Sequence, residues 1–353
     1  MTGVQTCALP ISDPDPTDVE QQTWGDSRAS RLDTTALNCV RGEAAAALAM
    51  LAWDDPQACG KALPLLTKLT NDPHPAIRMT VARGALAVAS VNEAEGAALF
   101  LHAMSHPDDT VLAGHWPQRA VQKCRWRMPD EVRPLIHRMA ESELGEVAEK
   151  GAFWATAEHF QQHALGEVYE ACRSGRPAQR LGIARIVRGL VAPPDQPDRV
   201  DRDEVAAALI ALFDDENEKV RAEAADTFRE KGVLESSWGP QVAEAFVKSK
   251  AFVENVTDLI WTLKGFPGDI SRYTATVLSA ASRLATEFAS DTHDIQTGRM
   301  SALPDLPGLL LKIYAKAQKS GNTDIAIECL DCWDAMLANR VAAADEMLDG
   351  LPD

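Results

Sequence analysis

Hydrophobic residues recur every three or four positions along most of this chain, which is the period of an amphipathic α-helix. Polar turns rich in Pro, Asp, Asn and Gly separate the periodic segments, for example at residues 71–73, 106–108 and 265–268. No segment alternates apolar and polar residues for long enough to predict a β-strand. The pattern predicts an all-α protein with helices at Ala36–Trp53, Pro56–Thr70, Ala76–Val91, Glu93–Ser105, Thr110–Arg127, Glu131–Glu141, Glu146–His163, Leu165–Arg173, Ala178–Val191, Asp203–Phe213, Lys219–Lys231, Gln241–Lys248, Phe252–Leu263, Ile270–Phe288, Leu306–Lys319 and Thr323–Met347.

Two segments look like copies of one unit. Each carries an aspartate, a β-branched residue five positions later and an arginine directly after it: Asp72, Ile77 and Arg78 in the first copy, and Asp215, Val220 and Arg221 in the second. We expect the aspartate to accept backbone N–H groups at a turn between two helices and to cap the second helix. The arginine falls beside the apolar stripe of that helix, where it can reach turn residues of a neighbouring unit.

This signature resembles the HEAT repeat, a helix-turn-helix unit with an Asp at the turn and a Val-Arg early in the second helix. The other helices match that repeat mainly in length, spacing and small-residue content. The resemblance implies an α-solenoid, a single array in which each repeat packs on its neighbours. At about 40–47 residues per repeat, the chain has room for roughly seven to eight stacked helix pairs.

A second, weaker resemblance concerns the C-terminal part. Residues 309–315 and 329–336 look like a helical segment near the C-terminus of some large bacterial NACHT or STAND-type NTPases. In that family, helical repeats follow the nucleotide-binding module and sense or bind a partner. This chain has no Walker motif, so no ATPase activity carries over, although a missing N-terminal module could be an NTPase.

The first residues set the domain boundaries that we expect. Met1–Ile11 resembles a translated sequencing-library adapter, which indicates an artefact joined to a reading frame whose natural start is missing. Residues 12–35 are polar, with Pro14 and Pro16, and we expect a linker or disordered tail. The helical repeat array then covers residues 36–353. The chain is therefore interpreted as an N-terminally truncated fragment of a larger bacterial protein.

Charge and composition narrow the classes of function. The formal net charge is −17, which disfavours a general binder of nucleic acid or of anionic membranes. No apolar run reaches the roughly 18 residues of a membrane span. Seven scattered cysteines indicate reduced thiols in a cytoplasmic protein. Phosphate-binding, zinc-protease and serine-hydrolase motifs are absent from the sequence, so we predict no catalytic activity and no cofactor.

We interpret two small clusters of candidate metal ligands as structural residues. Cys329 and Cys332 form a C-x-x-C, but a zinc site needs two further ligands. Both fall on one helical face with Trp333, so we interpret them as buried packing residues. His159 and His163 share a helical face and could chelate a transition metal, but the glutamines between them are typical of an exposed surface.

A basic, partly aromatic stretch in the middle of the chain offers an alternative function. Acids are absent between Asp109 and Asp130 and between Glu170 and Asp195. These intervals hold Arg119, Lys123, Arg125 and Arg127, and then Arg173, Arg176, Arg180, Arg185 and Arg188, with Trp116 and Trp126 in the first. Such a surface could meet nucleic acid or an acidic protein. The competing interpretation is that these side chains pair with acids of adjacent repeats.

The sequence as a whole predicts a protein-interaction scaffold or sensor region with an unidentified protein partner and no membrane contact. The alternative is a nucleic-acid-binding α-solenoid that uses the mid-chain arginines. At the C-terminus, the helical spacing of Ile325, Cys329, Trp333 and Met336 predicts that these residues face inward against the preceding helix.

Overall fold

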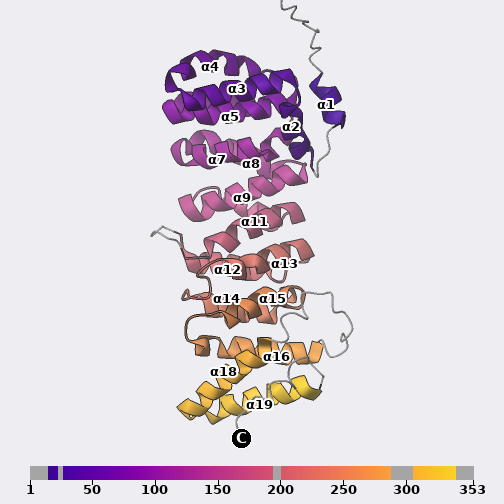
Figure 1. The fold of residues 1–353 in the computed structure, drawn as a ribbon, viewed down its shortest axis with the longest axis vertical. Helices are drawn as coiled ribbons and strands as arrows, with labels where there is room; N and C mark the ends of the chain where they lie inside the picture. The colour runs from indigo at the N-terminus through magenta and orange to yellow at the C-terminus, as the bar shows by residue number, and fades with distance from the viewer. Residues whose placement is uncertain (1–14, 23–26, 194–199, 288–304, 339–353) are drawn as a thin grey trace, which may run out of the picture. The chain divides into compact units, whose positions relative to one another are not determined.

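The computed structural model of the protein describes residues 15–22, 27–193, 200–287 and 305–338 (Figure 1). All regular structure in these ranges is α- or 3-10 helix, so the predicted all-α class is confirmed. No helix in the described ranges has the length and apolar character needed to cross a membrane. The predicted adapter segment, residues 1–11, lies outside the described residues.

The chain divides into two compact units. Unit 1 comprises residues 1–155 and 165–172, and unit 2 comprises residues 156–164 and 173–353. The first boundary falls within α9 (Gly145–Gln162). Unit 1 otherwise holds α1 (Pro16–Gln22), α2 (Arg28–Leu37), α3 (Val40–Asp54), α4 (Pro56–Leu69), α5 (Pro75–Val91), α6 (Glu93–Met104), η1 (Asp109–Ala113), α7 (His115–Arg127), α8 (Pro129–Glu141) and most of α10 (Gly166–Arg173).

Unit 2 has a core of aromatic rings. Phe246 contacts Phe213, Phe228 and Phe252, and the ring centroids of Phe228 and Phe246 are 4.8 Å apart. These rings join helices that are close in sequence order. The helices of this unit are α11 (Pro177–Leu190), α12 (Arg202–Leu212), α13 (Glu218–Ala225), η2 (Asp226–Arg229), α14 (Gly239–Lys248), α15 (Lys250–Lys264), η3 (Ile270–Tyr273), α16 (Thr274–Glu287), α18 (Asp305–Ser320) and α19 (Thr323–Ala338).

The predicted polar tail at residues 12–35 is wrong where the structure describes it. Helices α1 and α2 occupy much of this segment, and Leu32 is completely buried. Ala29, Leu32 and Ala36 form a short apolar stripe on α2 that packs against α5. Prolines and acids hid this stripe in the sequence, because only three small or medium apolar residues carry it.

The predicted helix Ala36–Trp53 is two helices, with a corner at residues 38–39. Asn38 ends α2 and Cys39 precedes α3 in an extended conformation. The two helices approach closely just after the corner. A Cβ atom on Gly42 would overlap the carbonyl oxygen of Ala36, so a residue with a side chain does not fit there without backbone movement.

Both signature arginines hold the turn that precedes their helix. Arg78 Nη1 donates to the carbonyl oxygens of Asp72 (2.6 Å) and Pro73 (3.0 Å). Arg221 Nη1 makes the same contacts six and five residues back, to Asp215 (2.6 Å) and Glu216 (3.1 Å). The two segments therefore have one geometry, as the spacing predicts. Ile77 and Val220, the residues before the arginines, are both buried.

The signature aspartates accept backbone N–H groups at the turn, as predicted, but they do not cap the second helix. Asp72 accepts the N–H of His74 (2.9 Å), and Asp215 accepts the N–H of Asn217 (2.8 Å). His74 and Asn217 are themselves the N-cap residues of α5 and α13. The aspartates thus order the turn, and the residue two positions later caps the helix.

Each aspartate also forms an ion pair with an arginine from an earlier helix of its own unit. Arg41 of α3 lies 2.8 Å from Asp72, and Arg180 of α11 lies 2.6 Å from Asp215. The same Arg180 also donates to the carbonyl of Gly175 in its own turn. Arg180 therefore repeats the turn contact of the signature arginines, although its sequence lacks the turn aspartate. Each ion pair therefore links an earlier helix to the turn that carries the signature aspartate.

The C-terminal helices pack largely as expected. Cys329, Trp333 and Met336 of α19 are buried, as are Leu309, Leu310 and Ile313 of α18, while Ile325 is half-buried. Helix α19 packs against both α16 and α18. The inward orientation predicted for the middle of the last helix is confirmed.

The N-cap of α5 contains a histidine that titrates. His74 Nδ1 accepts the N–H of Ala76 (3.3 Å), and its Nε2 lies 3.3 Å from a carboxylate oxygen of Glu20. Burial lowers the pKa of His74 below its usual 6.5, against the opposing effect of nearby carboxylates such as Glu20. Protonation at Nδ1 would also remove the acceptor that caps the helix.

Replacing His74 with asparagine should remove a pH dependence of stability. Asparagine keeps the cap, as Asn217 does in the second copy. The unfolded wild type binds a proton near pH 6.5 and the folded one only at lower pH, so stability present above about pH 6.5 is lost as the pH falls toward the folded pKa. Urea unfolding of both proteins across this range should show the wild-type advantage over His74→Asn shrinking. An advantage that is constant or larger at low pH would contradict the lowered pKa.

Candidate docking site around Trp261

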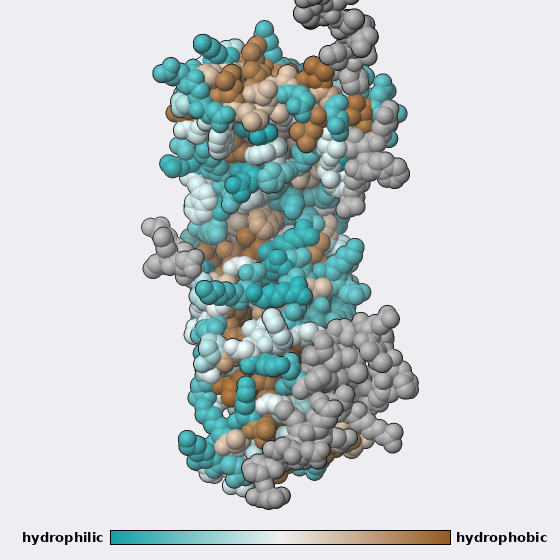
Figure 2. Space-filling model, in the orientation of Figure 1, coloured by the Kyte–Doolittle hydropathy of each residue, from teal (hydrophilic) through white to brown (hydrophobic). Residues whose placement is uncertain are grey.

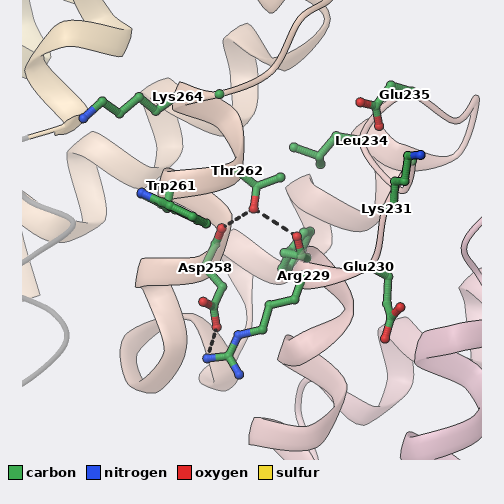
Figure 3. Close-up of a pocket in the computed structure, with 12 residues that line it drawn as sticks. Arg229, Glu230, Lys231, Leu234, Glu235, Asp258, Trp261, Thr262 and Lys264 are labelled. Atoms are coloured by element: carbon green, nitrogen blue, oxygen red, sulfur yellow. Dashed lines mark hydrogen bonds and ion pairs between the residues drawn. The ribbon is translucent and has the colours of Figure 1, made fainter.

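An open pocket of about 680 Å³ lies on unit 2, between the C-terminal half of α15 and the turn that follows η2 (Figure 3). Buried Phe228 and Leu234 contribute apolar surface to it, and Trp261 lines it with a side chain that is 71% exposed. The volume falls within the range of roughly 300–1,000 Å³ that is typical of ligand pockets. The pocket therefore combines an apolar floor with a large, accessible indole.

Trp261 is exposed because of its position on α15. The buried stripe of this helix consists of Phe252, Val256, Leu259, Ile260 and Leu263. Trp261 falls between Ile260 and Leu263 in the sequence, and its side chain points away from the core (Figure 3). A tryptophan off the buried stripe was a signal in the sequence that could have identified this site, although it belongs to no motif. Exposed aromatic side chains beside pockets are typical of binding surfaces.

The opposite wall of the pocket is a turn held by neighbouring side chains. Residues 230–238 connect η2 to α14, and Gly232 has a φ of 85°, a conformation that favours glycine. Two side chains donate hydrogen bonds to the backbone of this turn: Tyr273 to the carbonyl of Leu234, and Arg272 to that of Ser236 (2.6 Å). Trp238, within the turn, donates to the carbonyl of Val191 (2.8 Å). The wall is thus formed before any partner binds, which reduces the entropy lost on binding.

Tyr273 is a reliable donor in this arrangement. It is completely buried, and burial raises the pKa of its hydroxyl to about 12. The phenol therefore keeps its proton at any physiological pH. Thr262 ties the pocket floor to α15, since its hydroxyl lies 2.9 Å from the carbonyl of Phe228 and 2.7 Å from that of Asp258.

Two of the cations around the pocket are already paired. Arg229 lies 3.0 Å from both Asp226 and Asp258, and the hydrogen bond to Asp258 raises the pKa of Arg229 further. Lys264 lies 2.6 Å from Asp305. These pairs neutralise charge at the rim and leave the centre of the pocket apolar.

Lys231 and Glu235 complete the rim. Both are exposed, and neither belongs to an ion pair within the part of the chain that the structure describes. Figure 3 shows them on the side of the pocket across from Trp261. No histidine, cysteine or serine is among the described residues that line the pocket. The arrangement suits binding of an apolar group flanked by polar ones.

The basic residues predicted on α7 do not form one surface. Arg119 and Arg127 are exposed and Lys123 is half-buried, but Arg125 is 5% exposed. The guanidinium of Arg125 lies over Trp126 (4.4 Å) and Trp154 (5.3 Å), inside unit 1. The assignment of Arg125 to a basic surface is therefore corrected, because cation–π packing holds it in the interior.

Most arginines of the second basic stretch contact acids of the next helices. Arg180 pairs with Asp215, Arg185 lies 3.2 Å from Glu223, and Arg188 lies 2.7 Å from the same carboxylate. Arg188 also reaches Asp226 and Glu230, at 3.0 and 3.8 Å. Of the others, Arg173 is exposed at the end of α10 and Arg176 precedes α11 as its N-cap. The α11 arginines thus connect α11 to α13 and η2.

The surroundings of the candidate metal and redox residues are those of packing and surface residues. Cys329 and Cys332 are buried free thiols, and burial raises the pKa of each to about 11. His159 lies 3.4 Å from Glu204, and His163 adopts a φ of 52° just beyond the end of α9. Across the described ranges, no three His, Cys, Asp or Glu side chains gather in a way that could hold a metal ion.

Comparison with known proteins gives little further information. The chain matches no protein-family profile and no curated protein. One solved structure, the crystal structure of an engineered protein, aligns over 95% of this chain and 94% of that chain, with 13% sequence identity and a TM-score of 0.34. A TM-score this low supports no argument about fold or function.

Proposed function

We propose that this chain is a non-catalytic protein-interaction scaffold or sensor region, built from HEAT-like stacked helix pairs, and that it docks a protein partner at the Trp261 pocket. The exposed indole beside a pocket with a pre-formed wall is the observation that carries the proposal. Tryptophan is enriched among the residues that dominate binding energy at protein interfaces.

The recurring arginine contacts support the repeat architecture in this proposal. Arg78, Arg180 and Arg221 each donate to carbonyl groups of their own preceding turn. Each also contacts a side chain further along the chain: His106 and Asp215, which lie in turns, and Glu254 of α15, respectively. Recurrence of one contact set along a chain is expected when a single helix-pair unit is stacked repeatedly.

The pocket indicates the chemistry of the partner. We propose a polypeptide segment that places an aromatic or large aliphatic side chain against Trp261 and Phe228, with polar groups that reach Lys231 and Glu235. The resemblance of the C-terminal part to repeat regions of bacterial NACHT or STAND-type NTPases supports a sensing role within a larger cytoplasmic protein. No cofactor has a role in this proposal.

The alternative, a nucleic-acid-binding solenoid, has less support. Arg125 is buried, and Arg180, Arg185 and Arg188 are paired with carboxylates. Neutralised guanidinium groups release few counterions on binding phosphate. If the alternative held, binding of a fluorescent DNA or RNA oligonucleotide would weaken steeply with salt, and Arg119→Ala with Lys123→Ala would weaken it further.

The docking proposal is tested with peptides selected from a displayed library against the intact chain. Peptides that bind this pocket should lose at least tenfold in affinity, about 1.4 kcal/mol, when Trp261 is replaced by alanine. Because Trp261 is exposed, the Trp261→Ala protein should keep its melting temperature. Isothermal titration calorimetry measures the loss directly.

Ile327→Ala is the matched control. Ile327 is an exposed apolar residue on α19 of the same unit and does not line the pocket. Its replacement should leave peptide affinity unchanged. Selected peptides that bind wild type and Trp261→Ala equally well would refute the pocket as the docking site.

A further inference from the structure

Helix α3 of unit 1 is apolar on two opposite faces. One face, formed by Gly42, Ala45, Ala46, Ala49 and Ala52, is buried, and the helix packs against α4 and α5. The other face carries Val40, Ala44, Ala47 and Leu51, all exposed, with Val40 at 49% and Leu51 at 48%. A helix that is hydrophobic all round is normally covered on all sides.

The exposed face has the spacing of a helix–helix seam. Val40, Ala44, Ala47 and Leu51 are separated by four, three and four residues, which is the a/d pattern of a coiled coil. The small central residues allow a second helix to approach closely. The only charged side chains exposed on α3 are those of Glu43 and Asp54.

Further apolar surface lies beside the seam. Met50 and Trp53, at the C-terminal end of α3, are exposed and line a pocket of about 270 Å³ together with Arg83 and Trp116. Figure 2 shows hydrophobic residues gathered at the surface in the region of α3 to α5. An apolar area larger than one helix edge is what a stable interface needs.

The seam has the same order of side-chain sizes from either end of the helix. Medium or large residues stand at the ends and alanines in the centre, so an antiparallel copy of the helix places Val40 opposite Leu51 and Ala44 opposite Ala47. A twofold interface requires this self-complementarity. We propose that this face is an isologous interface, in which α3 of one copy of the chain pairs antiparallel with α3 of a second copy.

Charge favours the antiparallel arrangement. A parallel pair would place Asp54, seven residues after Ala47 on the seam, beside Asp54 of the second copy, and like charges at an interface are unfavourable. In the antiparallel pair, the position across from Asp54 lies beyond Val40, the first residue of α3, so the two Asp54 carboxylates are kept apart. The helix dipoles also oppose one another only in the antiparallel pair.

Charged substitutions at the two ends of the seam give a test that distinguishes the pairing. Val40→Glu and Leu51→Lys should each weaken self-association at least tenfold, as measured by sedimentation equilibrium. The double variant should restore it, because Glu at position 40 then faces Lys at position 51 of the other copy, twice per dimer. The two positions are about 16 Å apart along one helix, too far to pair within a chain.

Leu330→Lys serves as the control, since Leu330 is comparably exposed on α19, and it should leave self-association unchanged. Circular dichroism melting shows whether each variant folds. The proposal is overturned if the folded wild type stays monomeric up to about 100 µM, an affinity limit typical of weak contacts. It is equally overturned if the double variant associates more weakly than either single one, which is the outcome for a parallel pair or a different occupant of the face.

Discussion

Trp333→Ala should destabilise the protein by about 3–5 kcal/mol, the cost of other large-to-small changes in a packed core. Trp333 is 6% exposed on α19, with the neighbouring Cys329 and Met336 also buried. Removing the indole leaves a cavity in the helix layer formed with α16 and α18. Urea unfolding monitored by far-UV circular dichroism measures the loss.

The location of the damage is as informative as its size. In a repeat array most contacts join neighbouring units, so protection should fall first near the C-terminus and recover toward earlier helices of unit 2. Hydrogen exchange on Trp333→Ala maps this gradient. Unchanged protection of α18 and α19 would contradict the inward packing of Trp333, and uniform loss would contradict local, repeat-like coupling.

Arg78→Ala should cost about 3–4 kcal/mol, more than the roughly 1–3 kcal/mol expected for Arg221→Ala. Arg78 is 1% exposed and satisfies two turn carbonyls, so its removal leaves Asp72 and Pro73 with unpaired carbonyl oxygens. Arg221 makes the same turn contacts but also pairs with Glu254, which remains partly solvated after the change. Chemical denaturation of both variants gives the comparison.

Arg119→Ala provides the reference for a surface arginine in unit 1. Arg119 is exposed, so its replacement should change stability by no more than about 0.5 kcal/mol. Arg78→Lys should recover only part of the loss, because a single ammonium group cannot reproduce the planar fork of the guanidinium. Equal stabilities of Arg78→Ala and Arg119→Ala would show that the turn contacts contribute nothing.

The sequence predicted those features that depend on local periodicity. The 3.6-residue period is clear in many helices, for example α2, α8 and α14, so the all-α class followed from it. The matched spacing of Asp72–Arg78 and Asp215–Arg221 also located two equivalent turns correctly. Both signals are short-range, and the contacts they predict lie within a few residues.

Features that depend on distant partners were missed or misplaced. Arg125 appears in a basic run, but its environment is set by Trp154, which lies far away in the sequence. The pocket wall at residues 230–238 depends on Tyr273 and Arg272, and neither contact can be inferred from spacing. Arg180 holds its turn without the aspartate that marks the other copies, so the signature did not find it.

The most direct test of the scaffold proposal is a hydrogen-exchange footprint of the intact chain with and without a selected peptide. The account predicts that the peptide slows exchange in two segments, residues 228–235 and 258–265, which together line the pocket. It also predicts that Trp261→Ala abolishes this protection. Protection that falls instead on α7 and α11, with none at the Trp261 pocket, would contradict the proposal and favour a binding surface made by the mid-chain arginines.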